Sequence, residues 1–248
     1  MKKYLFLVLI PVLMLPRCSK FVVCNPGGEI VRQSYTFNGA DTLISGANMV
    51  VEIISASENK IEVEGYENIV EHFRFNYSGK TLRLDFDGNC FLRDEKNALK
   101  IKVFLTDVKV IRNSGEYRIF SRDTLRFERL TLVSENSDMP DSPALGDFDL
   151  KVDVRSLSVV SNNLSMFYLQ GHTDNLFVGF YAGLSRFEGK NLTAEKVYFI
   201  QKSSNDMLFY PVIKLEGDIY STGNVVIYHR PDTVKVREHF KGKLIRAY

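Results

Sequence analysis

Carboxylates at alternate positions are the residues of this chain best placed for acid–base chemistry. Asp147, Asp149 and Asp153 share the parity of one extended strand, with Lys151 on the same side. Glycoside hydrolysis needs two carboxyl groups about 5 to 9.5 Å apart, with their pKa values pushed in different directions. Carboxyl groups two residues apart on a strand can meet the required distance. Their surroundings are alike, however, so nothing would push their pKa values in different directions. The pattern therefore favours a solvated strand face, and the sequence predicts no catalytic residue.

The other reactive side chains fit no catalytic or metal-binding motif. The chain has no G-x-S-x-G, H-E-x-x-H, P-loop or dinucleotide glycine pattern. Its histidines are far apart in polar segments, which favours surface or turn positions: His72, His172, His229 and His239. A formal net charge of +2 gives no sign of the strongly basic face that nucleic acid requires. We therefore expect no cofactor, no metal and no nucleic-acid partner.

The three cysteines are scattered and contain no C-x-x-C pair, so they do not indicate a metal site. In an oxidising compartment Cys24 and Cys90 could form a disulfide. Cys24, however, lies beside Asn25-Pro26-Gly27-Gly28, in a segment that reads as a tether over residues 18–33. This position favours two unpaired thiols.

The N-terminus has the pattern of an export signal. Lys2 and Lys3 precede an apolar run from Tyr4 to Leu15, which is too short to span a bilayer as a helix. The next residues resemble a lipoprotein signal with Cys18 as the acylated residue, although Arg17 stands where such sites carry a small residue. We expect a signal peptide over residues 1–17 and an outer-membrane lipoprotein facing the periplasm or the surface. The alternative is a soluble secreted or periplasmic protein.

Alternating strands are predicted for the first part of the chain. Ile61 and Val63 alternate with charged residues, and Leu99–Leu105 alternates throughout, as strands with one buried face do. Tyr77-Ser-Gly-Lys80 lies between two such strands and predicts a hairpin. We therefore expect an N-terminal layer of antiparallel strands over residues 34–106.

After residue 107 the strands recur at a nearly constant interval. The recurring positions, separated by 19, 21, 18 and 19 residues, are Leu157, Leu176, Val197, Leu215 and Val234. A period near twenty that is made only of strands and turns is typical of a β-solenoid. Val108 and Leu130 would begin the first two coils. The sequence thus predicts an all-β fold, with single-stranded parallel β-helix-like coils and a C-terminal cap over residues 107–248, and one domain over residues 34–248.

Outward-facing residues of these coils include Phe177, Tyr198 and Ile200, so part of the outer wall is apolar. Either the N-terminal strands cover this wall, or it is a candidate binding face for a partner, an oligomer or a ligand. The last coil carries a group of basic residues: Lys235, Arg237, His239, Lys241, Lys243 and Arg246. This group reads as the polar cap that an open sheet edge needs, with contact to anionic lipid or glycan as the alternative.

Several segments resemble one known family. The best-matching piece runs from Leu215 to Pro231, and Asn113-Ser114-Gly115 and Tyr181-Ala-Gly183 stand where the family has glycine turns. Over most of residues 34–248 the chain resembles the putative auto-transporter adhesin, head GIN domain family of secreted and surface proteins from Bacteroidetes-type bacteria. Most Gly-Ser-Gly turns are replaced here, as in Ser203-Ser-Asn, so the chain would be a divergent member. The resemblance implies a strand layer leading into a β-helix and carries over no catalytic residue.

These observations predict a non-enzymatic module of the cell envelope that is adhesin-like or acts as a scaffold and binds through the outer faces of a rigid β-solenoid. The expected partners are a lipid anchor in the outer membrane, a glycan or protein ligand, and further copies of the chain. One alternative is a carbohydrate-active enzyme, a polysaccharide lyase or glycosidase, built on a β-helix. The other is a structural subunit of an envelope complex.

Overall fold

The computed structural model describes residues 22–88, 90–92, 94–135 and 144–248. The expected signal peptide, Cys18 and most of the loop between strands near residues 135–146 lie outside these residues. Helix within the described part is limited to α1 (Glu67–Val70) and the short 3₁₀ turn η1 (Glu95–Asn97). None of its helices is long and apolar enough to cross a membrane. The prediction of an all-β protein is confirmed.

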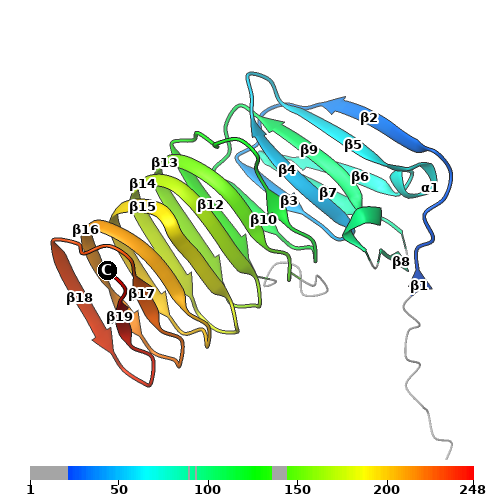
Figure 1. Ribbon diagram of the computed structural model, residues 1–248. Helices are drawn as coiled ribbons and strands as arrows, with labels where there is room; N and C mark the ends of the chain where they lie inside the picture. Colours follow the sequence, from blue (N-terminus) through cyan, green and yellow to red (C-terminus); the bar gives the residue numbers. More distant parts are fainter. Residues whose placement is uncertain (1–21, 89, 93, 136–143) are drawn as a thin grey trace, which may run out of the picture.

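Strands of the first half form the N-terminal sheet (Figure 1). Its strands are β2 (Ile30–Thr36), β3 (Thr42–Ser45), β4 (Met49–Ser55), β5 (Lys60–Tyr66), β6 (Phe73–Ser78), β7 (Thr81–Phe86) and β9 (Leu99–Leu105). In β5 and β9 the apolar residues are buried and the charged ones face outward, as their alternation predicts. The hairpin predicted at Tyr77–Lys80 joins β6 to β7, with Gly79 at a left-handed φ of 60°.

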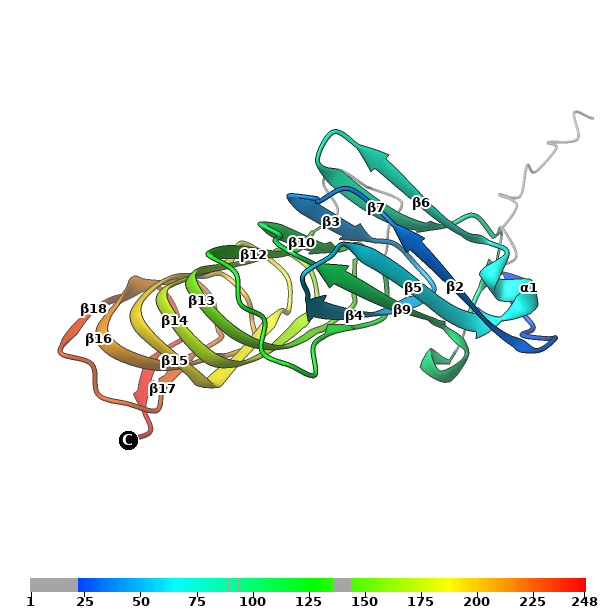
Figure 2. The same cartoon turned by 90° about the horizontal axis from the view of Figure 1, so that it is seen from above.

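Strands of the second half form the parallel stack, in which each strand pairs in parallel with strands of the preceding and following turns (Figures 1 and 2). They are β10 (Val110–Asn113), β11 (Ile119–Phe120), β12 (Arg129–Ser134), β13 (Phe148–Ser161), β14 (Met166–Phe180), β15 (Arg186–Gln201), β16 (Met207–Ile219), β17 (Val225–Ile227), β18 (Thr233–Glu238) and β19 (Leu244–Arg246). The long strands β13 to β16 bend as they pass around the stack, as Figure 2 shows from above.

Register within the parallel stack follows the predicted spacing. Leu157 pairs with Leu176, Leu176 with Val197, Val197 with Leu215, and Leu215 with Val234. The first interval differs from the expected one. The sequence suggested that Val108 and Leu130 occupy equivalent positions, but in the structure Ile111 pairs with Leu132, and Val108 lies before β10. The recurring apolar residues are therefore neighbours on successive strands, where they form one column that is buried as far as Leu215 and half-buried at Val234.

Phenylalanines fill the inside of the stack. Phe148 lies parallel to Phe167 with ring centroids 5.1 Å apart, and Phe167 contacts Phe180 at 5.7 Å. Further along the stack, Phe209 contacts Phe187 and Phe199 in the same way. All of these rings are fully buried. Because aromatic side chains bury large areas, this stack of rings contributes much of the hydrophobic stabilisation of the second half.

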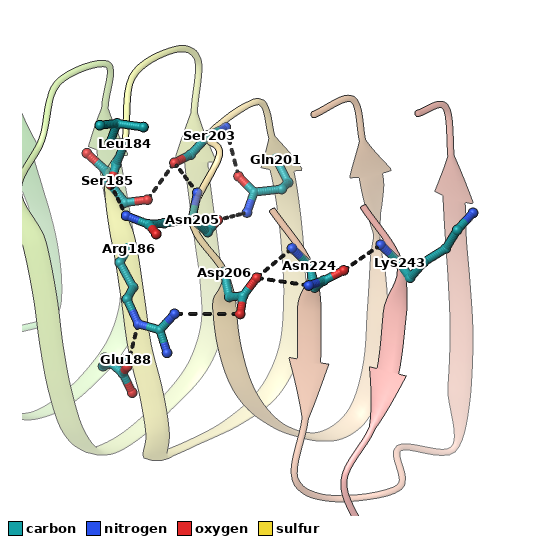
Figure 3. Close-up of polar contacts among 10 residues, drawn as sticks. All are labelled: Leu184, Ser185, Arg186, Glu188, Gln201, Ser203, Asn205, Asp206, Asn224 and Lys243. Carbon is teal, nitrogen blue, oxygen red and sulfur yellow. Dashed lines mark hydrogen bonds and ion pairs between the residues drawn. The ribbon is translucent and has the colours of Figure 1, made fainter. Parts of the chain in front are cut away.

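Serine and amide side chains pair with backbone groups at one corner of the stack, where successive turns lie side by side (Figure 3). The Ser203 hydroxyl donates to the Ser185 carbonyl at 2.6 Å, and the Gln201 side chain donates to the Asn205 carbonyl at 2.7 Å. Asn224 continues the ladder, accepting from the backbone of Lys243 at 3.0 Å. Buried backbone carbonyls need hydrogen-bond donors, and these polar side chains supply them.

The N-terminal sheet continues the parallel stack at one end. Strand β3 pairs in parallel with β10, and β4 pairs in parallel with β11, so the backbone edge of the first turn is hydrogen-bonded. The expected antiparallel layer is therefore a mixed sheet: β2–β5, β5–β9 and β6–β7 are antiparallel, whereas β3–β7 and β4–β9 are parallel. The N-terminal sheet lies at the end of the stack and does not cover its outer wall, contrary to the first expectation (Figures 1 and 2).

Cys24 and Cys90 form a disulfide, so the expectation of unpaired thiols is wrong. Strand β1 (Val22–Val23) pairs in parallel with β8 (Cys90–Phe91), which brings the two cysteines together. The segment expected to be a tether also binds α1, because the Asn68 side chain accepts from Gly27 and donates to the Asn25 carbonyl. Strand β2 begins at Ile30, so the folded part of the chain starts earlier than predicted.

The basic C-terminus is tied to the last turns of the stack by ion pairs. Asp218, which is 4% exposed, accepts two hydrogen bonds from Arg237 and lies 2.7 Å from Nε2 of His239. Lys243 pairs with Glu238 at 2.9 Å. The contacts of Asp218 hold β18 against β16.

Acid should weaken this cap. Hydrogen bonds from Arg237 hold the pKa of Asp218 below its usual value of 3.8, so its stabilisation is fully present above pH 3.8 and is lost as the pH falls through the lowered pKa. At pH 7 we expect Asp218→Asn to lower Tm by about 3 to 12 °C, because charge-assisted hydrogen bonds are lost. Thermal unfolding at pH 7 and pH 2 checks this. Equal Tm differences at both pH values would contradict the assigned role of the carboxylate.

Candidate functional site

The first candidate surface is the aromatic wall, which we define as Phe177, Tyr198 and Ile200 on the outside of β14 and β15. Phe177 stands directly opposite Tyr198 in the register, and their rings stack with centroids 5.8 Å apart. Tyr198 is 44% exposed, while Phe177 and Ile200 are half-buried. The predicted binding residues therefore lie together and remain accessible, since the N-terminal sheet lies elsewhere.

A shallow groove of about 350 Å³ runs beside this aromatic pair. It crosses four strands, and its polar rim includes Ser158, Asn175, Lys196 and Glu216. The Lys214 ammonium lies 2.5 Å from Glu216 and lowers the pKa of that carboxyl. An aromatic pair with hydroxyl, amide and charged groups around it offers both a flat apolar face and hydrogen-bonding partners. This combination suits a sugar ring or an exposed segment of another protein.

The second candidate surface is the charged cleft, a concavity of about 960 Å³ over the outer face of the N-terminal sheet. Its floor comes from β2, β5, β9 and β4, and β11 with its flanking residues supplies one side. The charged lining residues are Arg32, Glu52, Glu62, Glu64, Glu95, Lys96, Lys100, Lys102, Arg118 and Arg122. Alternation in the sequence indicates that many of these side chains face outward, but not that five strands place them in one cleft.

Charges in this cleft follow the strand register. In one row, Arg32 stands opposite Glu64, which stands opposite Lys100. In the next row, Glu62 and Glu52 lie on either side of Lys102. Opposite charges on neighbouring strands attract, so the pattern supports the sheet as well as lining the cleft.

The aspartates weighed for acid–base chemistry have different surroundings. Asp147 accepts a hydrogen bond from the backbone of Met166 at 2.8 Å, and burial raises the pKa of its carboxyl. Asp153 lies 3.7 Å from both Arg126 and His172, so it belongs to a different set of contacts. Neither of the two clefts described above is lined by Asp147, Asp149 or Asp153.

Among the described residues, tertiary structure brings together a set of potential metal ligands that the sequence did not indicate. His172, Asp174 and Glu195 each place a ligand atom within 4.8 Å of the others, because β14 and β15 are adjacent. This donor set could hold a divalent transition metal. The other histidines serve different contacts: His229 meets the Pro211 carbonyl, and His239 meets Asp218.

Comparison with protein families gives a match over most of the chain. Residues 41–231 match the family described as "Putative auto-transporter adhesin, head GIN domain". The chain belongs to this family. The match ends at Pro231, which is also the end of the segment that carried the closest resemblance in the sequence. It leaves the basic C-terminal cap outside the family's shared region.

Solved structures of bacterial proteins share the fold. A putative adhesin from Bacteroides fragilis has a TM-score of 0.79 at 16% identity, over 89% of this chain and 98% of that one. A putative adhesin from Parabacteroides merdae has a TM-score of 0.59 at 16% identity, over 90% and 98%. A putative lipid binding protein from Parabacteroides distasonis has a TM-score of 0.60 at 14% identity, over 89% and 98%. No curated protein matched the chain.

These comparisons support an adhesin-like domain and give no support to an enzyme. At such low identity the structural neighbours establish the fold alone, so the site must be argued from this chain's own residues. The groove beside the aromatic wall and the charged cleft are two accessible concave surfaces of the described residues.

Proposed function

We propose that this protein is an exported, adhesin-like binding module of the cell envelope, in which a rigid β-solenoid presents its outer wall to a glycan or protein. The observation that carries the proposal is the stacked and uncovered pair of Phe177 and Tyr198 beside a polar-rimmed groove. Large aromatic side chains on an exposed wall are costly in water, and they are the residues that most often dominate binding energy.

Rigidity is the second support for this function. Both aromatic residues lie in long strands whose neighbours are hydrogen-bonded on each side, and the residues that alternate with them along these strands are buried. A surface that is already ordered loses little conformational freedom when a partner binds. The stack therefore supplies a preformed binding face.

Export and anchoring complete the proposal. Membership of an adhesin family and a disulfide between Cys24 and Cys90 both suit a protein outside the cytoplasm. We propose that Cys18 carries the lipid anchor and that the folded domain follows it closely. Metabolic labelling with a fatty-acid analogue should mark the wild-type protein and fail to mark Cys18→Ala. Equal labelling of both proteins would remove the proposed anchor.

A pair of matched variants tests the aromatic wall. Tyr198→Ala should weaken binding to a ligand found on a glycan array, or to target cells in an adhesion assay, by about tenfold or more, as for an aromatic hot spot. Tyr168→Ala is the control, because Tyr168 is 45% exposed on β14 but does not line the groove. Equal loss in both variants, or a blank array together with no cell adhesion, would contradict the proposed function.

A further inference from the structure

The charged cleft has features that the proposed binding wall does not explain. It is the larger of the two concavities, about 960 Å³ against about 350 Å³, and it lies on the N-terminal sheet, away from Tyr198. Pockets of this size are those that small ligands occupy. Its lining carries six lysine and arginine residues against four glutamates, a surplus of two positive charges.

Lys102 lies in the middle of this cleft and is not engaged by any described residue. It projects from β9, the central strand, and is exposed. Glu62 on one side pairs with Lys60 at 2.8 Å, and Glu52 on the other pairs with Arg122 at 3.4 Å. Both neighbouring carboxylates therefore have other partners. An ammonium group with no fixed partner is available for an anionic group of a ligand.

Other cations around Lys102 are only loosely held. Lys100 lies 3.9 Å from Glu64, whose carboxylate already accepts from Arg32 at 2.6 Å. The side chain of Arg122 is 72% exposed. Ion pairs whose cation is this exposed contribute little to stability, so a ligand can replace them at little cost.

Phe120 orders the arginines on one side of the cleft. The guanidinium of Arg118 lies 5.0 Å from the centre of the ring, and that of Arg122 lies 5.9 Å from it. Stacking on an aromatic ring restricts a guanidinium, whose N–H groups match a carboxylate or sulfate. Each guanidinium also contacts a carboxylate of the cleft through Nε, Arg118 that of Glu95 at 3.0 Å and Arg122 that of Glu52 at 3.4 Å, so a ligand would share or replace these contacts. Two oriented forks therefore stand beside the lysines of the floor.

Carboxylates on the same floor require hydrogen-bond donors from the ligand. Glu52 and Glu62 lie between the cations, and carboxylates only accept hydrogen bonds. A ligand that carries both acidic groups and hydroxyl groups satisfies the two kinds of lining residue together. An extended peptide is less suited, because the cleft lies on the face of a sheet whose backbone groups are already paired.

We propose that the charged cleft binds a segment of an acidic oligosaccharide. Its acidic groups bind Lys100, Lys102 and the arginines beside Phe120, and its hydroxyl groups donate to Glu52 and Glu62. This site is separate from the aromatic wall, so the failure of either proposal leaves the other intact.

Calorimetric titration of the purified protein tests the proposal. The probes are a hyaluronan hexasaccharide and a galacturonate hexasaccharide, with maltohexaose as the neutral control and a short polyglutamate as the acidic peptide. We expect at least one acidic sugar to bind, more weakly as salt increases, and maltohexaose not to bind. Lys102→Gln should weaken the binding about tenfold. Lys190→Gln, at an exposed lysine on β15 outside the cleft, should leave it unchanged.

Three results would overturn the proposal: no binding of either acidic sugar, equal binding of maltohexaose, or tighter binding of polyglutamate than of both sugars. Lys100→Gln provides a second variant should Lys102→Gln lower Tm. If neither substitution weakens binding relative to Lys190→Gln, the acidic sugar binds elsewhere and the assignment of the cleft is wrong.

Discussion

Replacing Cys24 and Cys90 together by serine is expected to lower the free energy of unfolding by about 4 kcal/mol. The disulfide closes a loop across 66 residues, and a crosslink of that length removes much conformational freedom from the unfolded chain. For a protein of this size the change corresponds to a fall in Tm of about 8 to 16 °C. Thermal unfolding followed by circular dichroism measures it.

A reducing agent gives the matched control for the disulfide. It should lower the Tm of the wild-type protein toward that of the double serine variant and leave the variant itself unchanged. The double replacement avoids a lone thiol that could crosslink two molecules. If the variant and the wild type unfold at the same temperature, the disulfide does not constrain the part of the chain that limits stability.

Gly171→Ala is expected to lower the free energy of unfolding by about 2 to 5 kcal/mol, the sum of two costs. Gly171 has a φ of 115°, which side chains other than glycine rarely adopt, and an added Cβ would lie 2.0 Å from the Val152 carbonyl oxygen. Val152 is the partner of Gly171 on β13, so the strands would have to separate. Chemical denaturation measures the loss.

Gly79→Ala separates the two costs at Gly171. Gly79 also has a left-handed φ, but an alanine Cβ there would meet no atom within 4 Å. Its replacement should cost only about 1 to 2 kcal/mol, the backbone share of the effect. An equal loss in both variants would show that the close approach of β13 and β14 at Gly171 is relieved by a small shift of the backbone.

Spacing in the sequence was sufficient to predict the register of the parallel stack from Leu157 onward. A strand repeated every 18 to 21 residues can bury its apolar side chains only by placing equivalent positions beside each other, and Leu176 indeed pairs with Val197. The same logic placed Phe177 against Tyr198, since both alternate with core residues. These contacts follow from local periodicity, which can be read from a single amino-acid sequence.

Long-range pairing could not be deduced in the same way. The disulfide depends on β1 meeting β8, two very short strands separated by most of the N-terminal sheet. The position of the N-terminal strands is a second example. They could have covered the outer wall or extended the end of the stack, and the choice depended on which strand edge was open for pairing. Edge strands β10 and β11 offered unpaired backbone groups, and β3 and β4 bind there.

The sequence by itself therefore determined the all-β character of this protein, the repeat of its second half and the outward position of Phe177, Tyr198 and Ile200. Only the tertiary structure decided that this aromatic wall stays uncovered and that charges from β2, β5, β9, β4 and β11 gather in one cleft. The physical reason is that periodicity fixes which face of a strand is buried, whereas the partner of each strand edge is set by hydrogen bonds between distant segments.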